Sequence, residues 1–203
     1  TDHMFVMDYT PEKGWHDARI VPFADLVLHP ASTVFHYGAE IFEGMKAYRR
    51  ADGQVQLFRP MENIRRMNIS AERLCLPTIP EDIAYEALTT FVSVEKDWTP
   101  SANGTSLYLR PFMFGIGPVI GVKPSEEYQF RVFTTPVGPY FKGGVKPLTI
   151  KVSDFDRAAP NGTGHIKAGL NYAMSLYPIV QAHKEGYDEN MYLDPMTRTK
   201  VEE

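Results

Sequence analysis

Lys167 is the residue of this sequence whose chemistry stands out first. It lies in the glycine-rich segment PNGTGHIKAGLNY, residues 160–172, directly before a stretch with helical spacing. If a tight turn shields this amine from solvent, burial disfavours its charged form and frees it to attack a carbonyl group as a Schiff-base lysine. The composition of the segment alone favours an ordinary solvated lysine over that nucleophile.

Two phosphate-binding interpretations of the same segment fail. A Walker loop ending at Lys167 needs glycines where Asn161 and Ile166 stand, and a Ser or Thr where Ala168 stands. A dinucleotide fingerprint needs a third glycine where Lys167 follows the glycines at 162 and 164.

Two further segments carry polar and aromatic side chains that suit ligand binding. Residues 36–48, HYGAEIFEGMKAY, interleave aromatics with glycine and fit a packed corner or a binding wall equally well. Residues 106–111, SLYLRP, alternate as a strand does, which places Tyr108 and Arg110 on one face. That face suits a carboxylate, and an ordinary polar outer face explains it equally well.

Arg66 is the candidate for a phosphate. It shares a polar stripe with Asn63, Ser70 and Arg73, for which a solvated helix face is the simpler explanation. An arginine near a helix start nevertheless suits phosphate, because its planar fork binds two oxygens at once.

The elements that must position these residues follow from hydrophobic spacing and turn signals. A hairpin is predicted over residues 46–58, since Asp52 and Gly53 supply the positive φ of a tight turn. Short strands are predicted at residues 6–9, 26–28, 106–112, 128–134, 148–152 and 191–193.

Three helices are predicted from apolar residues at helical spacing. The first has a stripe of Ile64, Met67, Ala71 and Leu74. The second starts at residues 80–82 and should bury Ala84, Ala87, Leu88, Phe91 and Val94. The third has Ala173, Leu176, Tyr177 and Val180 at helical spacing. Gly186 should end the third helix, and Pro178 should kink it. The layout is α+β, with one domain at residues 1–138, a linker at 139–147 rich in glycine and proline, and the start of a second domain at 148–203.

Composition narrows the class of protein. The 203 residues are 43% hydrophobic and 23% charged, as in ordinary globular proteins. A net charge of −4 argues against a nucleic-acid or anionic-membrane binder, and no apolar run reaches the roughly 18 residues of a membrane span. The single cysteine, Cys75, excludes an intrachain disulfide. We expect a cytoplasmic protein, with mitochondrial import left open because any presequence would precede Thr1.

Taken jointly, these motifs resemble the branched-chain aminotransferases, pyridoxal-phosphate enzymes of fold type IV. The matching blocks are Arg-Ile-x-Pro at 19–22, Leu-His-Pro-Ala-Ser at 28–32, Phe-Glu-Gly-Met-Lys at 42–46, Leu-Phe-Arg-Pro at 57–60, Arg-Leu-Cys-Leu-Pro at 73–77, Gly-Thr-Ser-Leu-Tyr at 104–108, Pro-Val-Gly at 136–138 and Lys-x-Gly-x-Asn-Tyr at 167–172. The resemblance implies a complete small N-terminal domain, a larger C-terminal domain that is only partly present, and transamination of Leu, Ile and Val with 2-oxoglutarate.

The resemblance also assigns cofactor roles. Lys167 would form the Schiff base with pyridoxal phosphate and move the substrate α-proton. Tyr172 would hydrogen-bond the cofactor's phenolic oxygen, and Arg66 would clamp its phosphate. Glu203 would pair with the pyridine nitrogen, with Glu202 as the other candidate.

Substrate roles follow in the same way. Tyr37, Phe42 and Tyr140 would wall an apolar pocket, with Tyr140 on a linker that closes as a lid. Tyr108 would help to hold the α-carboxylate, and Arg110 would receive the distal carboxylate of glutamate or 2-oxoglutarate. The resemblance further implies a homodimer.

One residue departs from the family pattern, and the rest of the site is expected beyond Glu203. Leu170 stands where the family usually has glycine, so its side chain could crowd the lysine turn. Three alternatives stay open: another fold type IV enzyme (a D-amino-acid transaminase or an aminodeoxychorismate lyase), a phosphate-ligand binding module without chemistry, and a catalytically dead relative.

Overall fold

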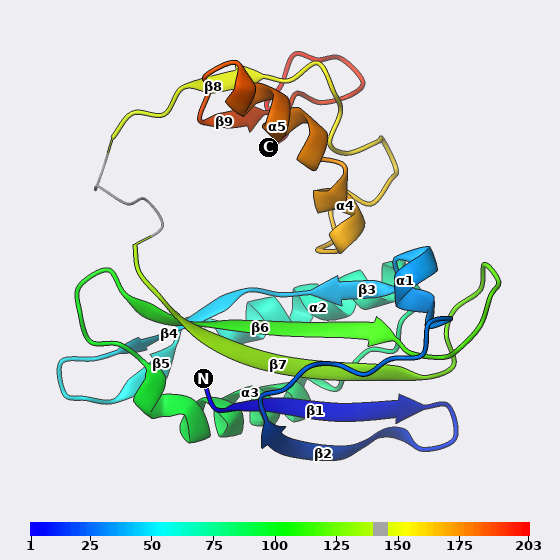
Figure 1. Cartoon of the computed structure of the whole chain (residues 1–203), viewed down its shortest axis with the longest axis vertical. Coiled ribbons are helices and arrows are strands. Elements are labelled where there is room, and N and C mark those ends of the chain that lie inside the picture. The colour runs from blue at the N-terminus through cyan, green and yellow to red at the C-terminus, as the bar shows by residue number, and fades with distance from the viewer. Residues whose placement is uncertain (140–145) are drawn as a thin grey trace. The chain divides into compact units, whose positions relative to one another are not determined.

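The computed structural model describes residues 1–139 and 146–203 (Figure 1). The chain divides into two compact units, Thr1–Tyr140 and Phe141–Glu203. Each unit is described by itself below. Within the described residues, no helix is long and apolar enough to span a membrane.

The first unit is built on an antiparallel sheet of seven strands. Its strand order is β2-β1-β7-β6-β4-β5, and β3 pairs with β6 beside β4. The strands are β1 (His3–Thr10), β2 (Gly14–Pro22), β3 (Glu40–Phe42), β4 (Met45–Arg49), β5 (Val55–Leu57), β6 (Ser106–Gly115) and β7 (Tyr128–Val137). The central strand β6 thus pairs with the early strands β3 and β4 and with the last strand of this unit, β7.

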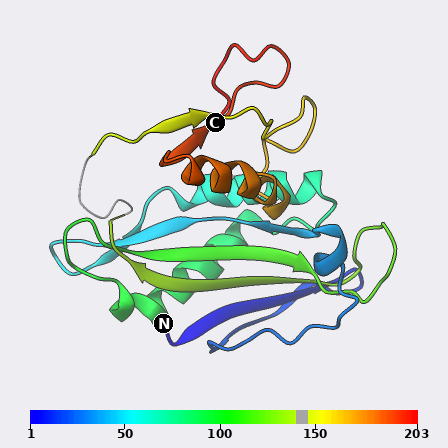
Figure 2. The same cartoon turned by 45° about the horizontal axis from the view of Figure 1, so that its top comes forward.

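Two helices, α2 (Pro60–Arg73) and α3 (Glu81–Glu95), pack on one face of this sheet (Figure 2). Helix α2 buries Ile64 and Met67 as the spacing predicts. On β6 the side chains alternate, so that Leu107 and Leu109 are fully buried while Tyr108 is half-buried on the other face. The predicted alternation is therefore confirmed, and it sends the candidate side chains Tyr108 and Arg110 away from the helices.

The local turn signals are also confirmed. Strands β4 and β5 pair as a hairpin, and Gly53 in the turn has a φ of 83°. The remaining helical elements of the first unit are short: α1 (Thr33–Tyr37) and the single 3-10 turn η1 (Lys96–Trp98).

The structure of this unit differs from the prediction at residues 26–28, at β2 and on α3. Residues 26–28 form no strand, and Val27 is 95% exposed, because three apolar residues without a partner strand make no ladder. Strand β2 was not expected, since its sequence GWHDARIVP lacks a clean alternation. On α3, Val94 is exposed, whereas Glu95 is buried because its carboxylate receives hydrogen bonds from the N-terminal strand at Asp2 N and His3 Nδ1.

The second unit contains a parallel pair of strands and two short helices. Strand β8 (Ile150–Val152) pairs in parallel with β9 (Glu189–Met191), two residues before the expected position of the latter. Helices α4 (Gly169–Ala173) and α5 (Leu176–Lys184) replace the single helix expected there.

The break between α4 and α5 has a local cause. Pro178 lies in the first turn of α5, and a proline ring clashes with the carbonyl four residues earlier, at Met174. The helix is interrupted at Met174 and Ser175, so the predicted distortion occurs N-terminal to the proline. Helix α5 ends as predicted, because Gly186 just beyond it has a φ of 90°.

Candidate active site

Three of the predicted substrate residues meet on the face of the first unit's sheet that is opposite helices α2 and α3. The guanidinium carbon of Arg110 lies 4.7 Å from the ring centroid of Phe42 and 5.3 Å from that of Tyr108. Arg110 Nη2 donates to the Tyr108 hydroxyl at 2.9 Å. Strand β6 carries Tyr108 and Arg110 two residues apart, and β3 pairs beside them with Phe42 opposite Phe112.

Arg110 has a buried donor that no group of the described residues accepts from. Among the described residues, its buried Nε has no hydrogen-bond partner. A buried guanidinium N–H that no side chain or backbone group satisfies costs free energy unless a ligand or water accepts from it. This donor, next to two aromatic rings, suits a carboxylate at the edge of an apolar wall.

Gly44 makes room for Tyr108. A Cβ atom built at Gly44 would overlap the Tyr108 hydroxyl oxygen, closer than real atoms approach. The glycine at this position is therefore required by space and not by a left-handed backbone. Sequence reasoning missed this role, since the motif around Gly44 gave no hint of which side chain crosses it.

The other two predicted substrate residues are Tyr37 and Tyr140. Tyr37 is the last residue of α1, which Gly38 ends with a φ of 57°. Its ring lies 6.2 Å from that of His36 and is 37% exposed. Tyr140 lies outside the described residues.

Arg66 projects from α2 and is paired with a buried carboxylate. Its Nε donates to Glu43 Oε1 at 2.7 Å, and its Nη2 donates to Glu43 Oε2 at 2.8 Å. The Glu43 side chain is fully buried and that of Arg66 is 48% exposed. Within the polar stripe, Arg66 and Arg73 are exposed, whereas Ser70 is buried and donates to the Arg66 carbonyl at 2.9 Å.

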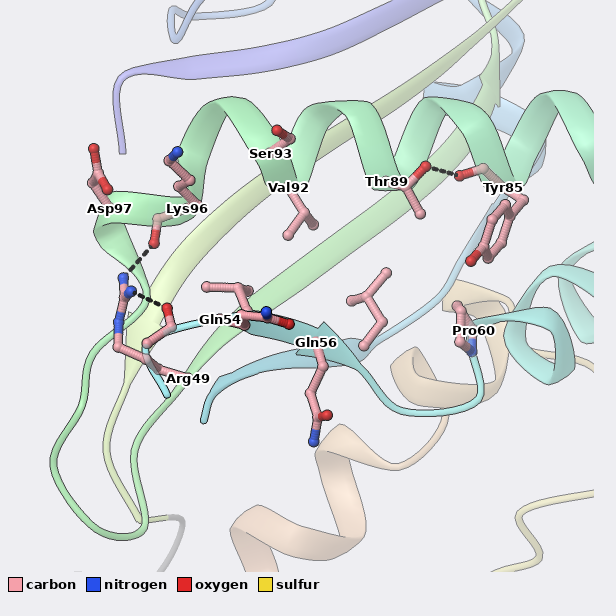
Figure 3. Close-up of a pocket in the computed structure, with 13 residues that line it drawn as sticks. Arg49, Gln54, Gln56, Pro60, Tyr85, Thr89, Val92, Ser93, Lys96 and Asp97 are labelled. Atoms are coloured by element: carbon pink, nitrogen blue, oxygen red, sulfur yellow. Dashed lines mark hydrogen bonds between the residues drawn. The ribbon is translucent and has the colours of Figure 1, made fainter. Parts of the chain in front are cut away.

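A separate hollow of about 810 Å³ lies in the first unit between the β4–β5 hairpin and α3 (Figure 3). None of the predicted site residues that the structure describes lines it. The Arg49 guanidinium at its edge is bonded to the carbonyls of Gly53, Lys96 and Thr99, at 3.0, 2.7 and 2.9 Å. These bonds are to backbone of the same unit, so the arginine has a structural role here.

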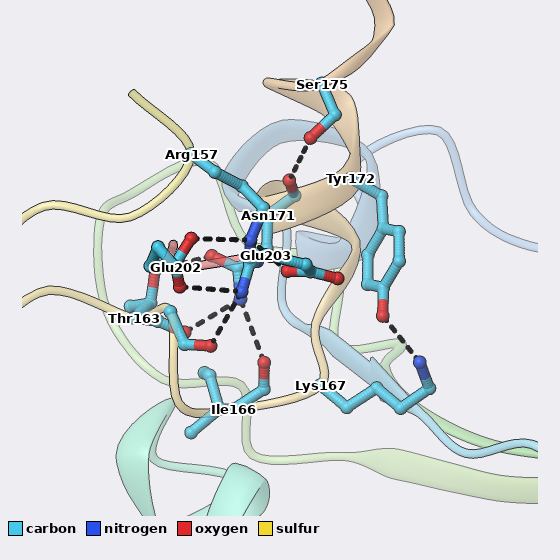
Figure 4. A network of polar contacts seen from close by, with 10 residues as sticks. Arg157, Thr163, Ile166, Lys167, Asn171, Tyr172, Ser175, Glu202 and Glu203 are labelled. Atoms are coloured by element: carbon cyan, nitrogen blue, oxygen red, sulfur yellow. Dashed lines mark hydrogen bonds and ion pairs between the residues drawn. The ribbon is translucent and has the colours of Figure 1, made fainter. Parts of the chain in front are cut away.

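In the second unit, Lys167 and Tyr172 form a direct pair (Figure 4). Lys167 Nζ donates to the Tyr172 hydroxyl at 2.5 Å and lies 4.7 Å from the ring centroid. Lys167 directly precedes the helix cap Ala168, and Tyr172 lies on the first turn of α4. The amine from the residue before the cap thus meets the phenol of a residue within α4.

Asn171 holds the lysine segment in shape, as Figure 4 shows. It is 2% exposed, and its side-chain amide donates to the carbonyls of Thr163 at 2.7 Å and Ile166 at 2.9 Å. Thr163 Oγ1 in turn donates to Asn171 Oδ1 at 2.9 Å. Leu170, where the family usually has glycine, is the second residue of α4 and has helical backbone.

Arg157 brings the two C-terminal glutamates to the same segment. It is bonded to Glu202 through Nε and Nη2, both at 3.2 Å, forms an ion pair with Glu203, and donates to the Gly164 carbonyl at 3.3 Å. Its side chain is only 14% exposed. Nothing in the sequence singled out Arg157, which lies 45 residues before Glu202.

Comparison with known proteins gives close relatives, although no family model matches the chain. The chain is 47% identical to the branched-chain-amino-acid aminotransferase of Mycolicibacterium smegmatis and 49% identical to the branched-chain-amino-acid transaminase 1 of Bacillus subtilis. These alignments cover 100% of the chain and 56% and 58% of the relatives. The chain thus spans somewhat more than half the length of the curated relatives it matches.

Solved structures of branched-chain aminotransferases share the fold of this chain. The branched-chain amino acid aminotransferase of Escherichia coli superposes with a TM-score of 0.73 at 26% identity, covering 96% of this chain and 60% of that one. The branched-chain amino acid aminotransferase of Thermobaculum terrenum, solved in its PLP form, shares the fold with a TM-score of 0.72 at 20% identity, covering 96% of this chain and 60% of that one. Along all of its 203 residues, the chain is similar to branched-chain aminotransferases, whose solved structures share its fold.

Proposed function

We propose that the full-length protein transfers the amino group between branched-chain L-amino acids (Leu, Ile and Val) and 2-oxoglutarate, with pyridoxal phosphate as cofactor. The observation that carries this proposal is the pair of Lys167 Nζ and the Tyr172 hydroxyl, 2.5 Å apart, in a chain 47% identical to a named aminotransferase. A lysine amine next to a phenol is the arrangement that a carbonyl cofactor needs for attachment and for a hydrogen bond to its ring oxygen.

The charged groups fit the cofactor. Pyridoxal phosphate has a phosphate, a phenolic oxygen and a pyridine nitrogen, and when bound it supplies the electron sink for the substrate's Cα. Arg66, supported by Glu43, would bind the phosphate, Tyr172 would donate to the phenolic oxygen, and Glu203 would meet the pyridine nitrogen. Arg157 supports this last role, because it binds the carboxylates of Glu202 and Glu203 and the Gly164 carbonyl of the lysine segment together.

The protein's own part in the chemistry falls to Lys167. Its amine would move a proton between the substrate Cα and the C4′ carbon of the cofactor. The Tyr172 hydroxyl, at hydrogen-bond distance, would keep this amine oriented. Asn171 would limit the movement of the loop that carries it.

Substrate recognition would fall to the first unit. Phe42 and Tyr37, with Tyr140 on the proposed lid at 139–147, would make the apolar wall for a branched side chain. Tyr108 would hold the α-carboxylate, and Arg110 would accept the second carboxylate of 2-oxoglutarate. The unpartnered Nε of Arg110 supports this last role, since a carboxylate there would satisfy it.

The organisation and surroundings of the protein complete the proposal. The chain would comprise a small domain at residues 1–138, a linker at 139–147 and the start of a larger domain at 148–203, and two copies would form a homodimer in the cytoplasm. Small amino and keto acids, and neither nucleic acid nor membrane, would be the partners.

The test uses the full-length protein. It should be yellow, and borohydride should fix the cofactor covalently on Lys167, as read by peptide mass spectrometry. It should also exchange the amino group of L-leucine with 2-oxoglutarate. A colourless protein that gains no mass at Lys167 with added cofactor would contradict the proposal and favour the phosphate-binding module.

Substrate comparison separates the remaining alternatives. Exchange with D-alanine in place of L-leucine would identify a D-amino-acid transaminase, and release of pyruvate from aminodeoxychorismate would identify the lyase. Cofactor attachment without any turnover would indicate a catalytically dead relative.

A further inference from the structure

The carboxylate of Glu43 is the most deeply buried charged group next to a proposed cofactor residue. Its side chain has 0% exposure, between Phe42 and Gly44 at the corner where β3 passes to β4. A buried carboxylate is costly unless its lone pairs are matched by donors. Its position therefore needs an explanation that the substrate wall does not provide.

The donors around Glu43 come from two elements. Besides the two bonds from Arg66, Asn63 Nδ2 on α2 donates to Oε2 at 2.9 Å, and the backbone N–H of Gly44 lies 3.3 Å from the same oxygen. The carboxylate is thus matched by charged, amide and backbone donors together. This set of bonds fixes the carboxylate, and through it the plane of the guanidinium.

The geometry of the pair decides which edge of Arg66 faces away from Glu43. Glu43 takes the edge of the guanidinium made by Nε and Nη2. A phosphate would therefore meet the opposite edge, made by Nη1 and the outer proton of Nη2. The two bonds to Glu43 restrict rotation about the last side-chain bonds of this half-exposed guanidinium.

We propose that Glu43 is a positioning residue for phosphate binding: its buried carboxylate holds Arg66 in the one orientation that presents the outer guanidinium edge to the cofactor phosphate. The inference rests on the proposed function, because it takes Arg66 as the phosphate ligand. It adds that the acidic residue of the Phe-Glu-Gly segment acts on the cofactor through Arg66 and does not touch the reacting atoms.

The experiment compares two ligands that differ only by the phosphate. Apoprotein of the full-length wild type and of Glu43→Gln is titrated with pyridoxal phosphate and with pyridoxal. We expect Glu43→Gln to weaken pyridoxal phosphate binding about tenfold and to leave pyridoxal binding unchanged, because the lost charge acts only through the phosphate site. Glu62→Gln is the matched control, since Glu62 also pairs with an arginine of α2, Arg65 at 3.0 Å, and it should change neither affinity.

A double-variant cycle tests whether the effect passes through Arg66. In an Arg66→Gln background, Glu43→Gln should cause no further loss of pyridoxal phosphate affinity. Equal loss for pyridoxal and pyridoxal phosphate, wild-type affinity in Glu43→Gln, or an additive double variant would each overturn the inference while leaving the aminotransferase proposal intact. A wild-type protein that binds neither ligand would instead contradict the proposed function and remove the basis of this inference.

Discussion

Arg66 and Glu43 are 23 residues apart in the sequence and meet only because β3 and α2 pack together, whereas Lys167 and Tyr172 are five residues apart and meet at the start of α4. The first pair includes a fully buried carboxylate, and the second is formed by residues with considerable exposure. The first unit thus presents its candidate side chains on a rigid sheet, and the second presents its lysine on a loop tied down by local hydrogen bonds.

This difference has a chemical consequence. Residues that recognise a fixed shape, such as a carboxylate or a phosphate, benefit from the rigid support of a sheet and helix. A lysine that must attach to a cofactor, leave it and move a proton needs freedom of its own side chain, with only its backbone held. The variants below test this distinction, from the largest expected effect to the smallest.

Lys167→Ala tests the loop side of the comparison. Loss of the amine should lower amino-group exchange between leucine and 2-oxoglutarate by at least about a thousandfold, because no other group described near Tyr172 can replace a covalent amine. Thermal unfolding should change little, since Lys167 contributes no core packing. Exchange that survives in this variant would show that the amine is not the reacting group.

Gly44→Ala tests the rigidity of the sheet side. The new methyl group would overlap the Tyr108 hydroxyl, so Tyr108 and the Arg110 side chain bonded to it must shift. We expect a loss of about 1–3 kcal/mol in the free energy of unfolding and a raised KM for 2-oxoglutarate. Gly121→Ala is the control, because its Cβ would lie 3.8 Å from the nearest atom, and it should change neither quantity. A Gly44→Ala protein as stable as the wild type would mean that this corner yields easily.

Asn171→Asp tests whether local bonds hold the lysine loop. The carboxylate can still accept from Thr163 Oγ1 but cannot donate to the carbonyls of Thr163 and Ile166. We expect about 2–3 kcal/mol of destabilisation and faster amide hydrogen exchange confined to residues around the loop. Exchange that speeds up equally in β6 would contradict the local character of this support.

The pH dependence of the free energy of unfolding tests the burial of Tyr128 in the sheet. Burial of the phenol, whose hydroxyl donates to the Cys75 carbonyl at 3.2 Å, raises the pKa of Tyr128 to about 12. The raised pKa means that the protonated phenol favours the folded state, so this stabilisation is complete below pH 10 and is lost as pH rises toward 12. Chemical denaturation between about pH 9 and 12 should give a steeper loss of stability in the wild type than in Tyr128→Phe, and parallel curves would contradict it.

Tyr108→Phe should have the smallest effect. It removes one hydrogen bond to Arg110, 2.9 Å long, while the ring keeps its place beside the guanidinium. We expect about 1 kcal/mol or less, seen as a few-fold rise in KM for 2-oxoglutarate with kcat nearly unchanged. A large fall in kcat would instead give the hydroxyl a part in the chemical step.

Local patterns predicted most of the fold of the first unit. The turn at Asp52 and Gly53, the buried stripe of Ile64 and Met67, and the alternation of Leu107 and Leu109 were confirmed, because each depends on neighbours within a few residues. The errors at Val94 and at residues 26–28 arose where a distant strand decided burial or pairing.

The contacts of the candidate site also divide into those that the sequence predicts and those that only the tertiary structure brings about. The amino-acid sequence alone determined that Lys167 and Tyr172 lie near each other, because only four residues separate them, and its motifs pointed to the branched-chain aminotransferases. Only the tertiary structure decided that Glu43 supports Arg66, that Gly44 admits Tyr108, and that Arg157 binds the segment at Glu202. These contacts join residues far apart in the chain, and no spacing rule determines which strand and helix will bring them together.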